Sequence, residues 1–240
     1  MLKKNTFAVC VPLTGENSEV LLGEIDAALA AKPDFLEWRR DYYTEEDAAQ
    51  EQAVLARLAA CEAGVIFTFR SAAEGGVRSC SDEERLAAIR RCVDAKAADY
   101  IDIELEGDPE FTAAVKALLS KEDCGLLLSH HNFERTYTMA EIVEILRRME
   151  AAGADVLKLA MLPINKEDLR REITAVQNYS LASDKPIVMI AMGELGKITR
   201  IAPDILGGSL SYAVVKNSTA PGQLSIAEIR HARRALGVEA

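Results

Sequence analysis

Hydrophobic and polar positions follow two alternating patterns along the chain. Short apolar runs are typical of strands, and the segments between them carry apolar residues at spacings of three and four, as at Ile142, Leu146 and Met149, which is typical of helices. The predicted strands are residues 6–12, 35–39, 65–70, 100–105, 125–131, 156–161, 186–192 and 209–214.

Eight strand and helix units in succession predict a parallel sheet closed into a (β/α)8 TIM barrel, an α/β fold. An open doubly wound sheet is the alternative, but the sequence has no Gly-x-Gly-x-x-Gly fingerprint to favour it. Ser81 with Glu84 and Thr138 with Glu141 have the capping-box spacing of helix starts. A chain of 240 residues fits one barrel, so we expect a single domain over residues 1–240.

One lysine interrupts an otherwise apolar strand. Lys158 lies in the run Val-Leu-Lys-Leu-Ala-Met at residues 156–161. Apolar surroundings favour the neutral amine, which is the form that attacks a carbonyl carbon. His130 and His131 end the preceding predicted strand, where an imidazole could transfer protons. Together these residues predict nucleophilic catalysis.

Other polar residues gather at the ends of predicted strands. The active site of a (β/α)8 barrel forms at the carboxyl ends of its strands, so these residues are candidates for substrate binding. Glu37 and Arg39 end the second predicted strand, Arg70 ends the third and Met192 ends the seventh. Because side chains alternate along a strand, Glu37 and Arg39 share one face.

The same alternation sends the two adjacent histidines to opposite faces. A metal site shared by His130 and His131 is therefore not expected, and no third ligand clusters with them, so we predict no metal. Simpler explanations exist, since Lys158 could be ion-paired, a histidine could be a packing residue, and Arg70 could pair with Glu74. Buried charges need partners, however, so several of them at strand ends favour a functional site.

Charge and cysteine content narrow the possible functions. A net charge of −10 and a pI of about 5.0 argue against binding to nucleic acid or to an anionic membrane. The five cysteines have no Cys-x-x-Cys spacing, which indicates neither a zinc site nor a disulfide framework. No run approaches the ~20 apolar residues of a membrane helix, and the first residues have no apolar signal core, so we expect a cytoplasmic protein.

Several motifs taken together resemble the type I 3-dehydroquinate dehydratases, Schiff-base-forming enzymes of the shikimate pathway. The motifs are Glu37-Trp38-Arg39, Phe67-Thr68-Phe69-Arg70-Ser71 with Glu74-Gly75-Gly76, Ser129 to Phe133, residues 156–160, and Ala220-Pro221-Gly222-Gln223. The resemblance runs nearly end to end, with the motifs in the same order and at comparable spacing. It implies a (β/α)8 fold, often dimeric, that converts 3-dehydroquinate to 3-dehydroshikimate and water without a cofactor.

The resemblance also implies a role for each matching residue. Lys158 matches the imine-forming lysine, His131 rather than His130 matches the general acid/base, and Glu74 matches the carboxylate associated with that histidine. The implied substrate-binding residues are Glu37, Arg39, Arg70, Arg200, Thr219, Gln223, Met192 and Tyr212. Among them, Arg200 matches the arginine that clamps the substrate carboxylate. Met192 and Tyr212 fall where the family has apolar pocket residues.

Two other functions stay open. A class I aldolase would use the same lysine but would break a carbon–carbon bond. A non-catalytic barrel would use its arginines to bind a small carboxylate anion or a protein partner, although the presence of Lys158, His131 and Glu74 argues against it.

Overall fold

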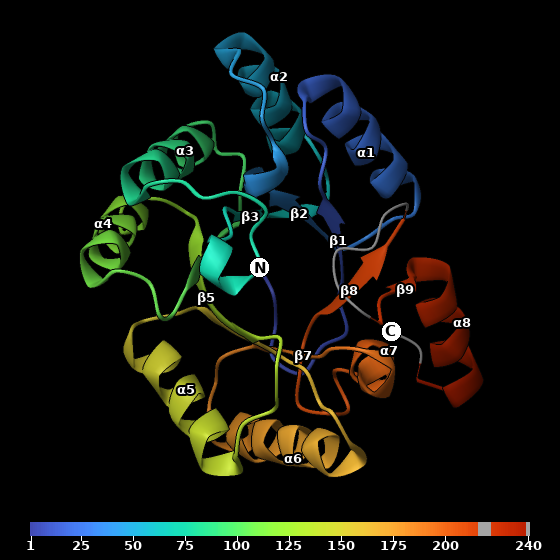
Figure 1. Ribbon diagram of the computed structural model, residues 1–240. Helices are drawn as coiled ribbons and strands as arrows, with labels where there is room; N and C mark the ends of the chain where they lie inside the picture. The colour runs from blue at the N-terminus through green and yellow to red at the C-terminus, as the bar shows by residue number, and fades with distance from the viewer. Residues whose placement is uncertain (216–221, 239–240) are drawn as a thin grey trace. The chain divides into compact units, whose positions relative to one another are not determined.

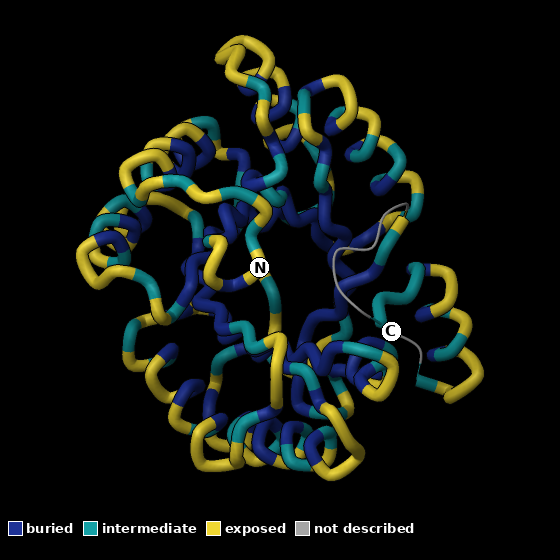
Figure 2. The backbone as a smooth tube through the Cα atoms, in the orientation of Figure 1, coloured by how far each residue is buried: buried dark blue, intermediate teal, exposed yellow. Residues whose placement is uncertain are grey.

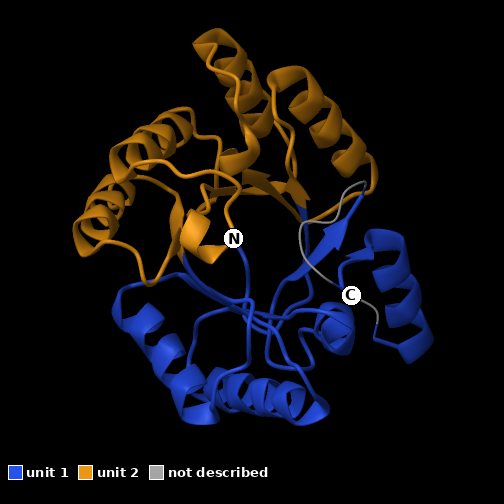
Figure 3. Cartoon of the chain, in the orientation of Figure 1, with its two compact units in different colours: residues 1–11, 128–240 blue, residues 12–127 orange. Residues whose placement is uncertain are grey.

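Strands and helices alternate along the chain in a computed structural model that describes residues 1–215 and 222–238 (Figure 1). The chain forms two compact units (Figure 3). The central unit consists of residues 12–127, and the terminal unit consists of residues 1–11 and 128–240. Strand β1 (Val9–Leu13) and strand β5 (Gly125–Asn132) span the two points at which the chain passes from one unit to the other.

The central unit is built around three neighbouring parallel strands. These are β2 (Phe35–Arg39), β3 (Gly64–Thr68) and β4 (Tyr100–Glu104), with β3 in the middle. Its helices are α1 (Ser18–Ala30), α2 (Ala48–Ala59), α3 (Asp82–Asp94) and α4 (Pro109–Leu119), and short 3-10 helices follow β2 (η1, Arg40–Tyr42) and β3 (η2, Ala72–Glu74). Parallel neighbours place their carboxyl ends at one edge of the sheet.

The terminal unit repeats the same alternation. Its strands are the later part of β5, then β6 (Val156–Met161), β7 (Ile187–Ala191), β8 (Ser211–Val214) and the short β9 (Leu224–Ser225). Its helices are α5 (Met139–Ala151), α6 (Lys166–Ala182), η3 (Glu194–Gly196), α7 (Lys197–Ile201) and α8 (Ile226–Leu236). The pairs β6 with β7, β1 with β8, and β8 with β9 are parallel.

Each of the eight predicted strands overlaps an observed strand, from β1 to β8 in chain order. The runs at 35–39 and 156–161 match β2 and β6 at both ends. The sequence did not predict β9, because two residues are too few to show an alternating pattern. Both predicted capping boxes are also confirmed, with Ser81 and Glu84 at the start of α3 and Thr138 and Glu141 at the start of α5.

The core of each unit lies between its strands and the inner faces of its helices. Figure 2 shows this as buried strands and as helices with one exposed and one buried side. Helix α5 is typical, because Ile142, Ile145, Leu146 and Met149 are its buried residues and recur at helical spacing. Every residue of β6 is buried, including its lysine. Within the described part of the chain, no helix is both long and apolar enough to cross a membrane.

Candidate active site

Lys158 is buried within strand β6. It is paired with Val188 of β7 in the parallel register, and the residue is only 3% exposed. Its Nζ donates a hydrogen bond to the hydroxyl of Tyr212 on β8, at 3.0 Å, and lies 4.6 Å from the centre of its ring. The hydroxyl and the ring face of Tyr212 thus both contact the amine of Lys158.

Arg200 binds the backbone of the same tyrosine. It belongs to α7, is 1% exposed, and donates from Nη1 to the backbone carbonyl of Tyr212 at 3.3 Å. Thr199 fixes this short helix to the end of β7, because its Oγ1 accepts from the amide of Ala191 at 3.2 Å and donates to the carbonyl of Gly196 at 2.8 Å. Burial lowers the pKa of Arg200 to about 10, so the guanidinium is charged at neutral pH. A buried guanidinium is a good binding group for a carboxylate.

The two histidines of β5 have different surroundings. His130 is buried, with Nε2 3.0 Å from the hydroxyl of Tyr137, and Asn132 donates to the same hydroxyl at 2.8 Å. His131 is half-buried, and its ring stacks on Phe133 with centroids 6.3 Å apart and planes 12° apart. The two imidazoles therefore have different partners. His130 belongs to the network that shapes the loop after β5.

Two glycines bring the segment before β9 close to the end of β7. A Cβ added to Gly222 would lie 2.3 Å from the carbonyl oxygen of Gly193, and Gly222 has a φ of +75°. Only glycine fits both the close approach and this backbone conformation. Gln223 is half-buried beside this contact, and Met192, at the end of β7, is 2% exposed. Thr219 lies outside the described residues.

In the central unit, Glu37 and Arg39 lie on one face of the sheet, as strand alternation predicts. Glu37 accepts a hydrogen bond at 3.0 Å from Thr68, whose side chain lies on the same face of β3. Arg39 makes two parallel hydrogen bonds to the Asp41 carboxylate, from Nε and Nη2, both at 2.8 Å. Burial lowers the pKa of Arg39, but Asp41 outweighs burial, and the net pKa is raised.

Arg70 lies at the centre of a buried network of charges at the end of β3. Its guanidinium donates to Asp102 at 2.8 Å and to Glu104 at 2.9 Å, and both acids belong to β4. Glu104 also accepts from the amide of Ser71 at 2.9 Å and from the guanidinium of Arg85. Burial raises the pKa of Glu104, but Arg70 and Arg85 outweigh it, so the net pKa of the carboxyl is lowered.

Glu74 ends the 3-10 helix that follows β3, where it is 9% exposed. The next two residues close a tight turn. Gly75 has a φ of +88°, and the amide of Gly76 donates to the carbonyl of Ser71 at 2.8 Å. A Cβ at Gly76 would lie 2.2 Å from the carbonyl oxygen of Arg70. The glycine pair therefore allows the chain after Glu74 to turn back against Arg70 and Ser71.

The sequence interpretation missed four residues that contact the predicted site residues: Asp41, Asp102, Glu104 and Tyr137. Asp102 and Glu104 did leave a signal, because two acids at alternate positions of the apolar run Tyr-Ile-Asp-Ile-Glu must share one face of a strand. Asp41 and Tyr137 lie in connecting segments, where residue type alone shows no partner. Among the described residues, no group of three or more His, Cys, Asp or Glu side chains could hold a metal ion.

Parallel β/α units with a buried lysine and buried arginines at strand ends are the features of a (β/α)8-barrel enzyme. Comparison with known proteins narrows this class to one family. The family model described as type I 3-dehydroquinase matches residues 9–240. The chain belongs to the type I 3-dehydroquinase family, and it is therefore an enzyme of the hydro-lyase class.

Named relatives agree with the family model. The 3-dehydroquinate dehydratase of Salmonella agona is 35% identical over 227 residues, which cover 92% of this chain and 90% of that one. The enzyme of the same name from Shouchella clausii is 34% identical over 226 residues, covering 92% of this chain and 88% of that one.

Solved structures agree as well. The 3-dehydroquinate dehydratase of Geobacillus kaustophilus is 30% identical with a TM-score of 0.91, over 97% of this chain and 92% of that one. The type I enzyme of Clostridium difficile, solved with covalently modified comenic acid, is 28% identical with a TM-score of 0.90 over 100% of both chains. These similarities confirm the predicted (β/α)8 TIM-barrel fold class.

Proposed function

We propose that this protein dehydrates 3-dehydroquinate to 3-dehydroshikimate through an imine between the substrate ketone and Lys158, without a cofactor. The relatives named above support the substrate, since they carry the name of this activity. The covalently modified ligand of the Clostridium difficile enzyme supports covalent chemistry in the family. The observation that carries the proposal is the lysine buried within β6, with its Nζ hydrogen-bonded to Tyr212.

The imine supplies an electron acceptor that is stronger than the ketone. The neutral Nζ of Lys158 attacks the carbonyl carbon. With one proton supplied by His131, the carbonyl oxygen leaves as water, which gives an iminium ion. Removal of a proton from the adjacent carbon then sends its electron pair toward the iminium nitrogen rather than into an unstable carbanion. Loss of the substrate hydroxyl as a second water forms the conjugated double bond. A final water hydrolyses the imine and returns the amine, so that one net water is released.

His131 is the proposed general acid/base. It would take the proton from the carbon and later give a proton to the departing hydroxyl. Its half-buried position on β5 supports this role, whereas His130 is occupied by Tyr137. Glu74 is proposed, from the resemblance, as the carboxylate of the same proton-transfer machinery.

The remaining residues would bind the substrate. Arg200 would hold its carboxylate through paired hydrogen bonds, which its planar guanidinium can make and a lysine cannot. Its deep burial supports this role, because an anion would offset the cost of holding the charge away from water. The proposed contacts to the hydroxyls, the carbonyl end and the ring are Glu37, Arg39, Arg70, Thr219, Gln223, Met192 and Tyr212.

We also propose that residues 1–240 form a single barrel domain that is cytoplasmic and homodimeric. The family model supports the single domain, because its match at residues 9–240 covers both compact units. The dimer rests on the resemblance to the family, and the cytoplasmic location rests on the sequence pattern described above. Gel filtration with light scattering would test the dimer.

Reduction of the enzyme with borohydride in the presence of 3-dehydroquinate tests the imine. Intact-protein mass spectrometry and peptide mapping should find one reduced adduct on Lys158, and none in Lys158→Met. The matched control is Lys166→Met, which replaces an exposed lysine at the start of α6. This variant should give the same amount of reduced adduct on Lys158 as the parent enzyme. An active, folded enzyme with no adduct would reject the imine.

The product separates the proposal from its alternatives. Dehydration gives a conjugated enone, whose ultraviolet absorbance rises as the reaction proceeds. An aldolase would give two fragments and no enone. A non-catalytic barrel would bind the carboxylate anion with no product.

A further inference from the structure

The hydroxyl of Tyr212 is placed at the reacting nitrogen. It lies 3.0 Å from Nζ of Lys158, and the ring centre lies 4.6 Å from the same atom. Both residues are buried, at 4% and 3% exposed, so water competes poorly for this contact. A phenylalanine would supply the apolar ring but not this oxygen. The contact therefore adds a polar group to a position where the family resemblance implies an apolar pocket residue.

We propose that Tyr212 is a positioning residue that holds the nitrogen of Lys158 before and after the imine forms; this inference rests on the function proposed above. A phenol oxygen accepts a hydrogen bond from a charged nitrogen. The ammonium has three N–H groups to offer, and the protonated iminium keeps one. Tyr212 Oη can accept from both species while the nitrogen changes from tetrahedral to planar, and the ring face favours the positive charge of each.

The same residue also sets the distance between the two ends of the substrate site. Its side chain binds Lys158, and its backbone carbonyl accepts from Arg200 at 3.3 Å. The nucleophile and the proposed carboxylate clamp thus both contact one residue of β8. Removing the hydroxyl breaks the contact to the nitrogen and leaves the backbone carbonyl in place. The two functions of Tyr212 can therefore be separated by a single substitution.

The separation predicts a specific kinetic result for Tyr212→Phe. The turnover number kcat should fall by about 10- to 100-fold, the size expected for losing a hydrogen bond to a charged group. The KM should stay within about 2-fold, because the contact that orients Arg200 is kept. Borohydride should still trap the substrate on Lys158, but the adduct should form more slowly. A residue that served only packing would not lower kcat and the trapping rate while leaving KM unchanged.

Tyr179→Phe is the matched control. Tyr179 lies on α6 of the same unit, and its hydroxyl is bonded at 2.7 Å to Glu150 rather than to the lysine. This variant should keep the parent kcat, KM and trapping rate. Thermal melting of all three proteins shows whether they fold.

Three results would overturn the proposal. They are an unchanged kcat with an unchanged trapping rate in Tyr212→Phe, a rise in KM alone, and an unfolded Tyr212→Phe beside a folded control, which would make the hydroxyl structural. Failure of the imine itself is distinguishable, because the parent enzyme would then give no adduct on Lys158.

Discussion

The imidazole of His130 and the hydroxyl of Tyr137 lie 3.0 Å apart, and this contact distinguishes His130 from its sequence neighbour His131. Tyr137 also receives a hydrogen bond from Asn132, so His130 helps to tie the end of β5 to the loop that precedes α5. His131 has the ring of Phe133 stacked on it instead. Replacing His130 should therefore destabilise the loop after β5, whereas replacing His131 should slow the reaction.

His131→Ala should slow turnover by roughly 100- to 10,000-fold, the range of general acid/base catalysis, while Lys158 still forms a trapped adduct. Steady-state rates and adduct mass measure the two effects. His130→Ala is the control, and it should mainly lower the free energy of unfolding, by about 1–3 kcal/mol, because Tyr137 loses its buried partner. If the large rate loss followed His130→Ala instead, the assignment of the acid/base to His131 would be wrong.

Arg200→Ala should raise the KM for 3-dehydroquinate by about 10- to 100-fold, because a charged hydrogen bond to the substrate carboxylate is lost. Initial rates over a wide range of substrate concentrations measure this. Arg234→Ala removes an exposed arginine from α8 and should leave KM unchanged. An equal KM for Arg200→Ala and the parent would reject the carboxylate clamp.

Glu104→Gln should destabilise the protein by about 3–5 kcal/mol at pH 7, since it leaves Arg70 and Arg85 buried beside a neutral amide. Urea denaturation measures the change. The lowered pKa of Glu104 gives the sign of the pH dependence, because its charged form is favoured in the folded state. Its contribution is present above the ordinary carboxyl pKa and is lost as pH falls, so the gap between parent and variant should narrow at low pH.

Asp26→Asn is the control for Glu104→Gln. Asp26 pairs with Arg57 on the surface of the same unit, and its side chain is 68% exposed. The change should cost less than about 1 kcal/mol at every pH, because exposed ion pairs contribute little. A similar cost for both variants would mean that the buried network around Arg70 has no special role in stability.

Glu172→Gln should stabilise the protein, and more strongly at pH 8 than at pH 5. Glu172 is fully buried on α6, and neither carboxyl oxygen has a hydrogen-bond partner among the described residues. Burial raises the pKa of this carboxyl well above its ordinary value. The folded state thus favours the protonated form, and stability is lost as pH rises above the unfolded pKa. The amide avoids this loss, and we expect a gain of about 1–3 kcal/mol at pH 8.

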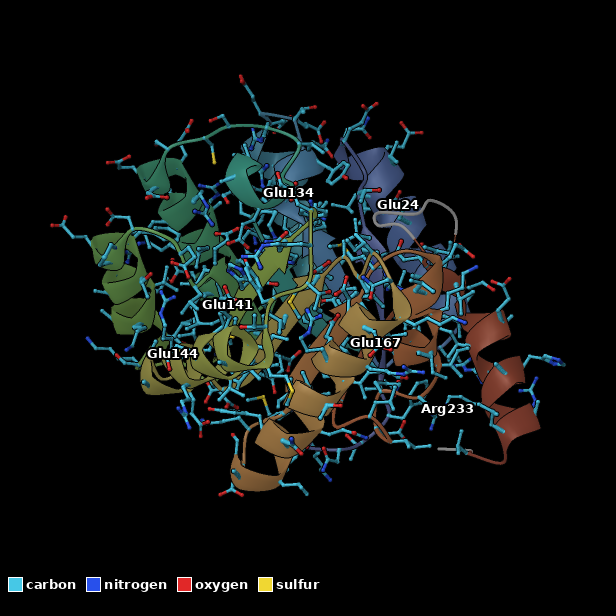
Figure 4. The ribbon with its side chains drawn as sticks, turned by 60° about the horizontal axis from the view of Figure 1, so that its bottom comes forward. Glu24, Glu134, Glu141, Glu144, Glu167 and Arg233 are labelled. Atoms are coloured by element: carbon cyan, nitrogen blue, oxygen red, sulfur yellow. The ribbon has the colours of Figure 1, made fainter. Side chains whose placement is uncertain are left out.

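Urea midpoints at the two pH values measure the effect of Glu172→Gln. Glu167→Gln is its control on the same helix, where Figure 4 labels Glu167. Glu167 is exposed and pairs with Arg170. This surface change should shift stability by less than about 1 kcal/mol, without a step between pH 5 and pH 8. A variant Glu172→Gln that is less stable than the parent at pH 8 would show that the carboxylate is well solvated or paired.

The strands, their order along the chain and the face on which each strand residue lies could be predicted from the sequence. These properties are local. A run of apolar residues and the two-residue period of a strand decide them without reference to distant parts of the chain. For this reason the sequence alone predicts that Lys158 lies in β6 and that Glu37 and Arg39 share one face. The family motifs added the proposed roles of these residues, because motif order and spacing can also be read from the sequence.

The partners of these residues were decided by the tertiary structure. Arg70 meets Asp102 and Glu104 across 32 and 34 residues, and Lys158 meets Tyr212 across 54. Such pairs depend on which strands are neighbours and on their register, and both follow from the packing of whole strands and helices rather than from any local pattern. The sequence by itself thus determined which side chains stand at the strand ends, and only the fold decided which hydroxyl, carbonyl or carboxylate each one meets.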